Sequence, residues 1–347
     1  HGLVAGTTGS GKSETLQTYI LSLAVNYSPD DIAFFIIDYK GGGLAGTFEN
    51  ERYHLPHLAG TITNLDGGAI QRSLVSIQSE NRRRQDMFNK ARDITGESTM
   101  DIYKYLSYYR QGILTEPLPH LMIIADEFAE LKQQEPEFMD ELISAARIGR
   151  SLGVHLILAT QKPSGVVNDQ IWSNSRFKVC LKVSDAGDSR EMIHREDAAR
   201  ITRPGQYYLL VGYDESFSSG QAAYAGGGYA PSNQFEVKRD TAVELLDEEG
   251  EVIARLRQQR AAAKTDMSEL NAVLAQIEEA SRITGKQARR LWLDPLPPAI
   301  SLAQLDKEYG SVKKTGLNVV VGEADDPENQ RKFRYEVDFA TAGNILL

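Results

Sequence analysis

The stretch His1-Gly-Leu-Val-Ala-Gly-Thr-Thr-Gly-Ser-Gly-Lys-Ser13 decides the fold, because it joins a short apolar run to a phosphate-binding pattern. The run Leu3 to Ala5 predicts a short buried strand, and Gly6-x-x-x-x-Gly11-Lys12-Ser13 has the spacing of a P-loop. After the loop, apolar residues recur at helical spacing up to about Asn26, at Leu16, Ile20, Leu23 and Ala24. Strand, glycine loop and helix in this order are the context that makes a P-loop credible; the alternative is a glycine turn that binds nothing.

The loop residues have separate expected roles in holding a nucleotide. Glycines let the backbone turn tightly, so that N–H groups and the N-terminus of the following helix converge on phosphate oxygens. Lys12 is expected to reach the β- and γ-phosphates, and the Ser13 hydroxyl to ligate Mg²⁺. The predicted nucleotide-binding residues of the loop are Gly6, Thr7, Thr8, Gly9, Ser10, Gly11, Lys12 and Ser13.

Composition is that of an ordinary soluble globular protein. The 347 residues are 41% hydrophobic and 25% charged, enough for one large domain or one domain plus a smaller unit. No apolar run approaches the roughly 18 residues of a membrane span, and no signal-peptide pattern opens the chain. A start at a residue other than Met, inside a strand, suggests an excerpt from a longer protein.

Charge and cysteine usage narrow the function classes. The net charge of −10 disfavours non-specific binding to nucleic acid, although a local basic loop stays compatible with it. Cys180 is the only cysteine, so no internal disulfide can form and a reducing compartment fits. Its burial is left open by strand alternation, and a small structural residue is favoured over a nucleophile. The six histidines show no metal-ligand spacing.

A second apolar strand, Leu121 to Ala125, ends in Asp126-Glu127, which is what a P-loop needs as its partner. Asp126 can hold Mg²⁺ directly or through water, and Glu127 can orient and polarise the attacking water. An aspartate followed by a glutamate indicates hydrolysis rather than kinase-like transfer. Without the P-loop this pattern would be weak.

Further strands indicate one α/β nucleotide-binding domain up to about Tyr213. The strand from Val154 to Ala159 ends at Thr160-Gln161. This polar pair can contact the γ-phosphate; the alternative is that it only marks the end of the strand. The strand from Ile32 ends at Asp38, and Lys40 follows it. One interpretation places both residues near the P-loop, because ligands of α/β sheets bind at this edge. The other is that Asp38 caps the strand and Lys40 is solvated. The other predicted strands are 177–183 and 206–211.

Helices are expected between these strands, at about Ala69 to Lys90, Met100 to Arg110 and Pro136 to Ser151. The run Arg82-Arg83-Arg84 is interpreted as a solvated helix face. Gly220 to Tyr229 is glycine-rich but lacks phosphate-loop spacing, so it is expected to close the domain as irregular chain.

Beyond Pro231 the character of the chain changes. Strands at 243–246 and 251–253 predict a hairpin, and apolar spacing from Leu270 to Ile277 predicts a helix. The basic stretches 255–264 and 286–290 are interpreted as solvated faces. Strands are predicted at 316–322, 334–339 and 343–347, and they are interpreted as parts of an incomplete further unit. The expected domains are an ATPase domain at 1–231, a linker with accessory hairpin and helices at 232–315, and the truncated start of a following ATPase module at 316–347.

The motifs together resemble the FtsK/SpoIIIE ATPase family over about residues 1–230. They are the P-loop, Asp38-Tyr-Lys-Gly-Gly-Gly43, Asp126-Glu127, the segment Arg147 to Ser164 and Asp188-Ser-Arg190. Within that family, Gly6 to Glu14 and Thr61-Ile-Thr-Asn-Leu65 look like the EssC/EccC proteins of type VII secretion. The tail adds weight, because Leu296-Pro-Pro298 and Val321 to Pro327 look like the segment between two ATPase modules of such proteins.

The resemblance implies a RecA-like α/β fold with a mostly parallel sheet flanked by helices, and ATP with Mg²⁺ as cofactors. It assigns hydrolysis to Asp126 and Glu127, γ-phosphate sensing to Thr160 and Gln161, and an arginine finger acting on a neighbour's ATP to Arg150, with Arg147 second. The structural alternative for Arg150 is a cap on its own helix.

The resemblance also implies a setting: a cytoplasmic module of a protein anchored in the bacterial membrane, working with neighbouring ATPase modules in a ring or hexamer. Its expected partners are small helical WXG-type substrates and membrane channel components. Two other functions stay open: a DNA translocase of the same family, which the charge disfavours, and a regulatory module that holds ATP without turning it over.

Overall fold

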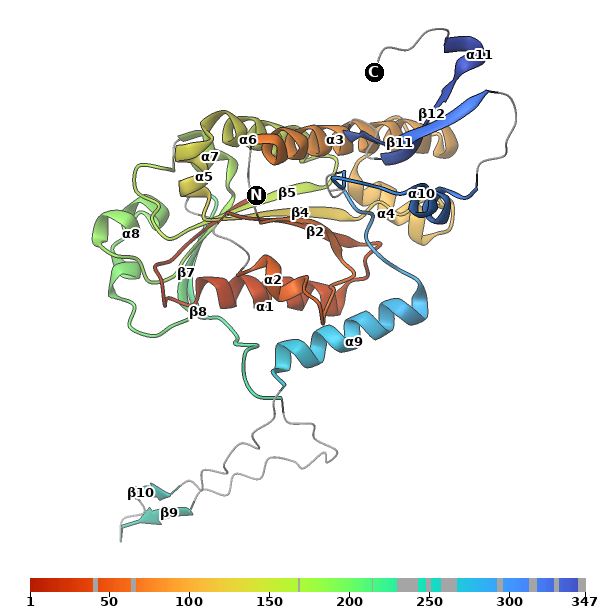
Figure 1. Cartoon of the computed structure of the whole chain (residues 1–347). Coiled ribbons are helices and arrows are strands. Elements are labelled where there is room, and N and C mark those ends of the chain that lie inside the picture. The colour runs from red at the N-terminus through yellow and green to blue at the C-terminus, as the bar shows by residue number, and fades with distance from the viewer. Residues whose placement is uncertain are drawn as a thin grey trace.

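The structure is a computed structural model that describes residues 1–39, 43–63, 67–167, 169–213, 215–229, 243–247, 251–256, 267–291, 296–311, 317–327 and 331–342 (Figure 1). One eight-stranded sheet forms the centre, in the order β3-β2-β4-β5-β1-β6-β7-β8. The first six strands run parallel to their neighbours, and β7 and β8 are antiparallel. This confirms the predicted mostly parallel α/β fold. The strands are β1 Gly2–Ala5, β2 Ile32–Asp38, β3 Leu58–Ile62, β4 His120–Asp126, β5 Val154–Thr160, β6 Phe177–Cys180, β7 Gln206–Val211 and β8 Ser216–Gln221.

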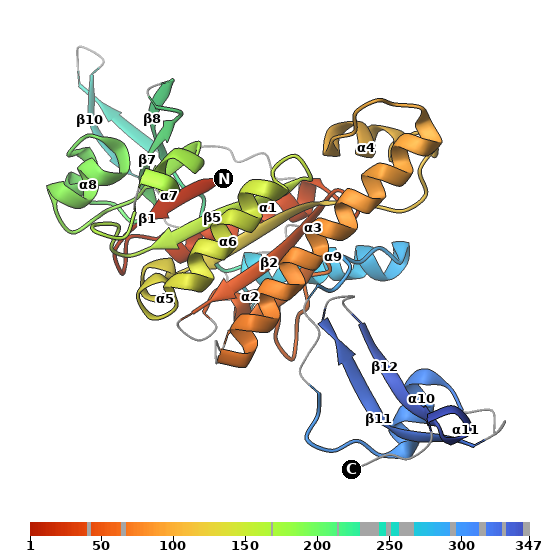
Figure 2. The ribbon, with the colours of Figure 1, turned by 90° about the horizontal axis from the view of Figure 1, so that it is seen from above.

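Helices cover both faces of this sheet (Figures 1 and 2). One face carries α1 Lys12–Asn26, α2 Ala45–Phe48 and α9 Glu269–Thr284. The other carries α3 Gly67–Thr95, α5 Phe128–Gln134, α6 Pro136–Gly149 and α7 Asp169–Asn174, and α4 Ile102–Arg110 packs at the end of α3. Close to β6 and β7 lie α8 Ala186–Ile193 and the 3₁₀ turn Asp197–Arg200.

Alternation along the strands builds two cores from one sheet. In β1, Leu3 and Ala5 pack into the core on the α6 side, whereas Val4 packs into the core on the α1 side. Parallel strands that are buried on both faces read as nearly continuous apolar runs, which is why β1, β2 and β4 were visible in the sequence. Because these strands run parallel, their carboxyl ends lie at one common edge of the sheet.

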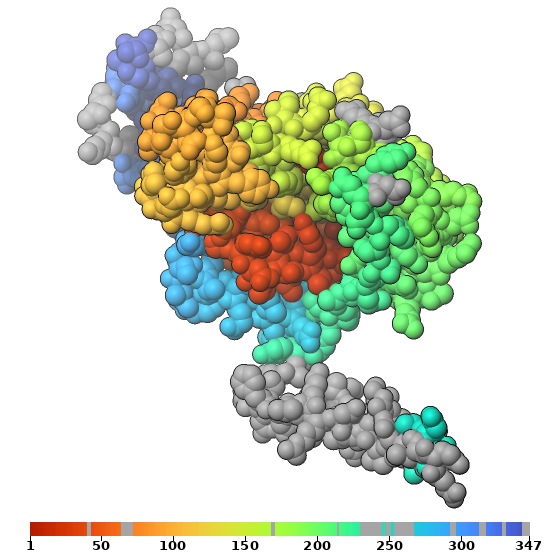
Figure 3. All heavy atoms as spheres, turned by 180° about the vertical axis from the view of Figure 1, so that it is seen from behind, coloured from red at the N-terminus to blue at the C-terminus, as the bar shows by residue number. Residues whose placement is uncertain are grey.

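The segment after Pro231 includes a helix that packs on the domain. Leu270 and Leu274 of α9 lie in the same core as Leu16 and Ile20 of α1, and Figure 3 shows α9 lying along the underside of the residues that follow the P-loop. Part of the predicted linker thus contributes to the core. The domain boundaries themselves stay predictions.

The remaining elements after residue 242 include two short antiparallel strand pairs that are not part of the eight-stranded sheet. The predicted hairpin is confirmed as β9 Val243–Leu246 paired antiparallel with β10 Val252–Leu256. A second antiparallel pair, β11 Asn318–Asp326 and β12 Arg331–Asp338, follows α10 Leu302–Tyr309 and leads into α11 Phe339–Ala342. The predicted strand at 343–347 lies outside the described residues.

Two interpretations from the sequence were wrong. Arg84 is not on a solvated face: it is 1% exposed and pairs with Glu80, which is equally buried. Gly220 to Tyr229 is not merely irregular chain, because Gly220 and Gln221 end the edge strand β8. Backbone hydrogen bonds to β7 hold β8 in the sheet, although the serine-rich sequence of β8 does not predict a strand.

The open question about Cys180 is settled by its burial. The residue is 0% exposed, and burial raises the pKa of its thiol to about 12. The thiol is therefore protonated at neutral pH, as expected of a structural residue rather than a nucleophile.

Candidate nucleotide site

The P-loop lies between the ends of two strands that flank β1. The Gly6 N–H donates to Thr160 O at 3.1 Å, at the end of β5, and the Thr7 N–H donates to Lys182 O at 2.8 Å, just past β6. These anchors fix the loop against the sheet before any ligand arrives. Gly11 has φ +89 as the N-cap of α1, and a Cβ there would lie 2.7 Å from Gly205 N. Only glycine fits that position.

Lys12 points from the first turn of α1 toward the end of β4, where it pairs with both Asp126 and Glu127. All three side chains are buried, with exposed fractions of 5% to 7%. The strand order explains this meeting, because β5 alone separates β1 from β4 and their parallel carboxyl ends share one edge. The structure thus brings together the three residues that the sequence predicted for phosphate binding and hydrolysis.

The two carboxylates differ in local structure. Asp126 ends β4, and its Oδ1 accepts from the Glu127 N–H at 3.0 Å. Burial raises the pKa of the Asp126 carboxyl, although the Lys12 ammonium opposes the shift. Glu127 has φ 57, a left-handed conformation unusual for glutamate, and it is the N-cap residue of α5. Such a backbone persists only where the surroundings hold it, and here it turns the Glu127 carboxylate toward Lys12.

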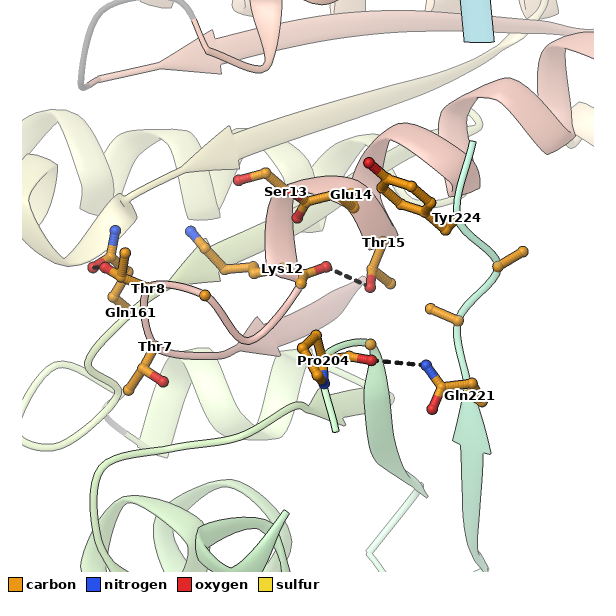
Figure 4. A pocket seen from close by; sticks show the side chains of 15 residues that line it. Thr7, Thr8, Lys12, Ser13, Glu14, Thr15, Gln161, Pro204, Gln221 and Tyr224 are labelled. Carbon is orange, nitrogen blue, oxygen red and sulfur yellow. Dashed lines mark hydrogen bonds between the residues drawn. The ribbon is translucent and has the colours of Figure 1, made fainter. Parts of the chain in front are cut away.

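A cavity of about 440 Å³ opens beside this cluster, over the first turn of α1 (Figure 4). Predicted residues Thr7, Thr8, Lys12 and Ser13 line it, together with Gln161, whose Oε1 accepts from the Thr8 hydroxyl at 2.9 Å. Thr160 is buried and its hydroxyl interacts with the backbone of Lys162. Of the predicted sensor pair, Gln161 is therefore the residue that lines the cavity.

The residues present fit a nucleotide with Mg²⁺. Ser10 Oγ is buried without a hydrogen-bond partner within the loop, and the cavity walls supply backbone N–H groups at a helix N-terminus. Among the described residues no group of three or more His, Cys, Asp or Glu could hold a metal ion. A Mg²⁺ site of this class uses one or two protein oxygens and completes its shell with phosphates and water, so Ser13 and Asp126 suffice.

Asp38 lies at the same edge and has a structural task there. It pairs in register with Asp126, and its Oδ2 accepts from the Leu44 and Ala45 N–H groups at 2.8 and 3.2 Å. These bonds hold the start of α2. Lys40 lies outside the described residues.

Arg150 lies at the opposite edge of the sheet. It is the C-cap residue of α6, close to the start of β5, whereas the P-loop is tied to the far end of β5. Seven residues of strand separate these edges by about 20 Å. Arg147 and Arg150 are both exposed. Neither arginine can reach the P-loop of its own chain.

The sequence did not identify the second wall of the cavity. Pro204, Gly205 and the segment Gln221 to Tyr224 line the side away from Lys12. Pro204-Gly205 is typical of a simple turn before the strand 206–211, and the glycine-rich segment lacks a phosphate-loop spacing. No local pattern marks these residues, because β7 and β8 bring them to the P-loop through tertiary pairing.

Comparison with known proteins agrees with this geometry. The model of the FtsK/SpoIIIE family matches residues 1–165. Those residues form an FtsK/SpoIIIE-family domain. The matched part holds the P-loop, the Asp126-Glu127 strand and Gln161, so the family resemblance is confirmed over these residues, whereas the expected extent to about residue 230, with Asp188-Ser-Arg190, lies beyond the matched range.

Similarity to known proteins extends over the whole chain. The type VII secretion system protein EssC of Staphylococcus aureus (strain NCTC 8325 / PS 47) is 46% identical over 358 residues, covering 100% of this chain and 23% of that protein. The ESX secretion system protein EccC of Geobacillus thermodenitrificans (strain NG80-2) is 45% identical, covering 99% and 22%. The chain thus spans under a quarter of the length of these relatives.

A solved structure has the same fold. The cytoplasmic domain of the Thermomonospora curvata type VII secretion ATPase EccC matches with a TM-score of 0.71 and 27% identity, covering 98% of this chain and 36% of that one. In this chain, no helix within the described ranges is long and apolar enough to cross a bilayer.

Proposed function

We propose that the chain is an ATP-binding and ATP-hydrolysing motor module of a type VII protein secretion system. The observation that carries the proposal is the buried meeting of Lys12 with Asp126 and Glu127 beside the P-loop cavity. Its chemistry is that of a P-loop hydrolase, and the 46% identity to EssC supplies the setting.

In this proposal the three charged residues divide the work. Lys12 leaves its two carboxylates and binds the β- and γ-phosphates, which frees Glu127 to accept a hydrogen bond from the attacking water. Ser13 and Asp126 would hold Mg²⁺, which would supply positive charge to the triphosphate during hydrolysis. Glu127 then takes the proton of the water. The proposal assigns γ-phosphate sensing to Thr160 and Gln161, and the hydrogen bond between Gln161 and Thr8 of the P-loop supports this role for Gln161.

Completion of the site requires a neighbour. Arg150 lies about 20 Å from its own P-loop, across the length of β5, so it can act as an arginine finger only on another module's ATP. An arginine finger contributes about 10³–10⁵-fold to turnover in related P-loop enzymes. The separated module is therefore expected to be slow until it meets a second copy or an adjoining module.

The test is the ATPase rate per subunit as a function of protein concentration, for the parent, Arg150→Ala and the matched variant Arg147→Ala. The proposal predicts a rate that climbs with concentration in the parent and in Arg147→Ala, and stays low and flat in Arg150→Ala. A parental rate in Arg150→Ala would refute the finger assignment. ATP binding with no turnover at any concentration would favour a regulatory module.

The wider setting is part of the same proposal. The module lies in the cytoplasm as part of a membrane-anchored protein, works in a ring or hexamer, and drives export of small helical WXG-type proteins through membrane channel components. The relatives' names support the secretion system, and the solved cytoplasmic domain of an EccC ATPase supports the cytoplasmic location. Tight, salt-sensitive binding to duplex DNA would instead favour the DNA translocase alternative.

A further inference from the structure

The cavity beside the P-loop has two ends of different chemistry (Figure 4). Thr7, Thr8 and Lys12 lie at one end, where phosphates bind. Around the other end lie Thr15, Pro204, Gln221 and Tyr224, which are uncharged, and the carboxylate of Glu14 lies between Ser13 and Tyr224. A nucleotide whose phosphates bind at the first end must place its base toward the second.

The second end is held rigidly against the P-loop. The Gly205 N–H donates to Ser10 O at 2.7 Å, and the Ala222 N–H donates to Gly205 O at 2.8 Å. Farther along the wall, the Thr18 hydroxyl of α1 donates to Ala223 O at 3.0 Å. The wall is thus tied by hydrogen bonds to both the loop and the helix that bind phosphate.

Tyr224 is set at the mouth of this wall. Its side chain is 65% exposed, although it lines the cavity, so its ring has area left to bury against a ligand. The residue that follows it in the chain, Ala225, accepts from the Leu270 N–H at 2.8 Å, which fixes the backbone next to α9. The ring also lies directly over Gly226, where a Cβ would be 2.5 Å from Tyr224 Oη. The missing side chain at Gly226 leaves room for this ring position.

We propose that Tyr224 is the base-binding residue of the site and that the purine ring of the nucleotide stacks on its aromatic face, above the wall formed by Pro204, Gly205 and Gln221. The proposal rests on the proposed function, because it needs the phosphates at the P-loop. Stacking on an aromatic ring tolerates any base, so Tyr224 contributes affinity for the nucleoside rather than a choice between adenine and guanine.

The test separates the two ends of the cavity by using two ligands on the whole chain, Mg·ATP and inorganic tripolyphosphate, each titrated by calorimetry. Tyr224→Ala is expected to weaken ATP binding by about 5- to 150-fold, which corresponds to the about 1–3 kcal/mol of a stacked base. Binding of tripolyphosphate should not change. Tyr224→Phe, which keeps the ring, should bind ATP as the parent does.

The matched control is Tyr213→Ala, which removes another exposed tyrosine outside the cavity and should leave both ligands unaffected. An equal loss of ATP and tripolyphosphate in Tyr224→Ala would mean a damaged P-loop and would overturn the proposal. So would an unchanged affinity for ATP. A parent chain that binds neither ligand would instead refute the proposed function itself.

A glycine pair tests the same ring without touching it. Gly226→Ala should displace the Tyr224 ring and weaken ATP binding in the same direction, again without an effect on tripolyphosphate. Gly227→Ala is the control, because a Cβ there meets nothing closer than Glu269 at 3.9 Å. Equal ATP affinity in the two glycine variants would contradict the ring position on which the proposal depends.

Discussion

Two buried clusters of charge lie at opposite edges of the same parallel sheet, and they differ in how completely their charges are matched. At the carboxyl edge, one cation, Lys12, faces two carboxylates and an open cavity. At the amino edge, Arg84 donates to Glu80 at 2.8 Å and to Leu152 O at 2.9 Å, and both charged side chains are 1% exposed. Arg83 adds a second guanidinium to Glu80.

This difference distinguishes a cluster that can bind a ligand from a cluster that only stabilises the fold. The guanidinium of Arg84 is a planar group with fixed donors, and Glu80 and the Leu152 carbonyl accept from it in the folded chain without any rearrangement. Lys12 is a compact cation on a flexible stem, and it can exchange its carboxylates for phosphate oxygens. A buried charged cluster that faces a cavity and whose positive and negative charges are unequal therefore indicates a functional site. A buried charged cluster whose groups all have partners indicates a structural role.

The largest expected effect is on the amino edge. Glu80→Met should lower the free energy of unfolding by about 3–5 kcal/mol, because it leaves Arg84 buried without its carboxylate. Glu80→Met with Arg84→Met should recover most of that loss. Urea unfolding measures both. Glu116→Gln is the control: Glu116 pairs with Arg83 but is 63% exposed, so its loss should cost at most about 1 kcal/mol. Equal losses at Glu80 and Glu116 would break the comparison.

A smaller effect should appear with acid at the same edge. His155 Nε2 lies 3.0 Å from His120 Nδ1, and burial, followed by the nearby His120, lowers the pKa of His155 to about 4. Because the unfolded histidine binds its proton at about pH 6.5, stability is present above that pH and is lost as pH falls toward 4. The loss can reach about 3 kcal/mol. Unfolding of His155→Gln between pH 7 and 4 should show a flatter profile; an unchanged slope would contradict this assignment.

The smallest expected effect on stability is at the carboxyl edge. Asp126→Asn leaves Lys12 paired one-to-one with Glu127, and it removes a carboxylate whose ionisation burial opposes, as its raised pKa indicates. The nucleotide-free chain should therefore unfold within about 1 kcal/mol of the parent, or be more stable. Hydrolysis of ATP should nevertheless become slower and require a higher Mg²⁺ concentration, because one of the two proposed Mg²⁺ ligands is weakened. A destabilisation as large as that of Glu80→Met would show the two clusters to be alike.

Much of the fold and part of the site were accessible from the sequence. The apolar runs of β1, β2, β4 and β5 predicted strands, and the family resemblance implied that the sheet is mostly parallel. Because parallel strands gather their carboxyl ends, Lys12, Asp126 and Gln161 were expected at one edge. These are properties of local pattern and of sheet geometry. The roles of these residues in hydrolysis stay predictions.

The parts that the sequence missed depend on contacts between distant segments. Arg84 sits in a run of three arginines that predicts a solvated face, and it is the distant Leu152 that closes over it, next to Glu80 one turn earlier on the same helix. Tyr224 follows an edge strand without an apolar pattern, and it reaches the cavity because β8 pairs with β7. Neither burial nor a pocket wall of this kind leaves a periodic signal.

The central claim is that the carboxyl-edge cluster hydrolyses ATP, and Glu127→Gln tests it most directly. Single-turnover hydrolysis and ATP binding would be measured in the same samples of the parent, Glu127→Gln and the control Glu130→Gln, one turn further along α5. Glu127→Gln should bind ATP but hydrolyse it about 10²–10⁴-fold more slowly, with Glu130→Gln unchanged. Hydrolysis by Glu127→Gln at the parental rate would show that Glu127 is not the base.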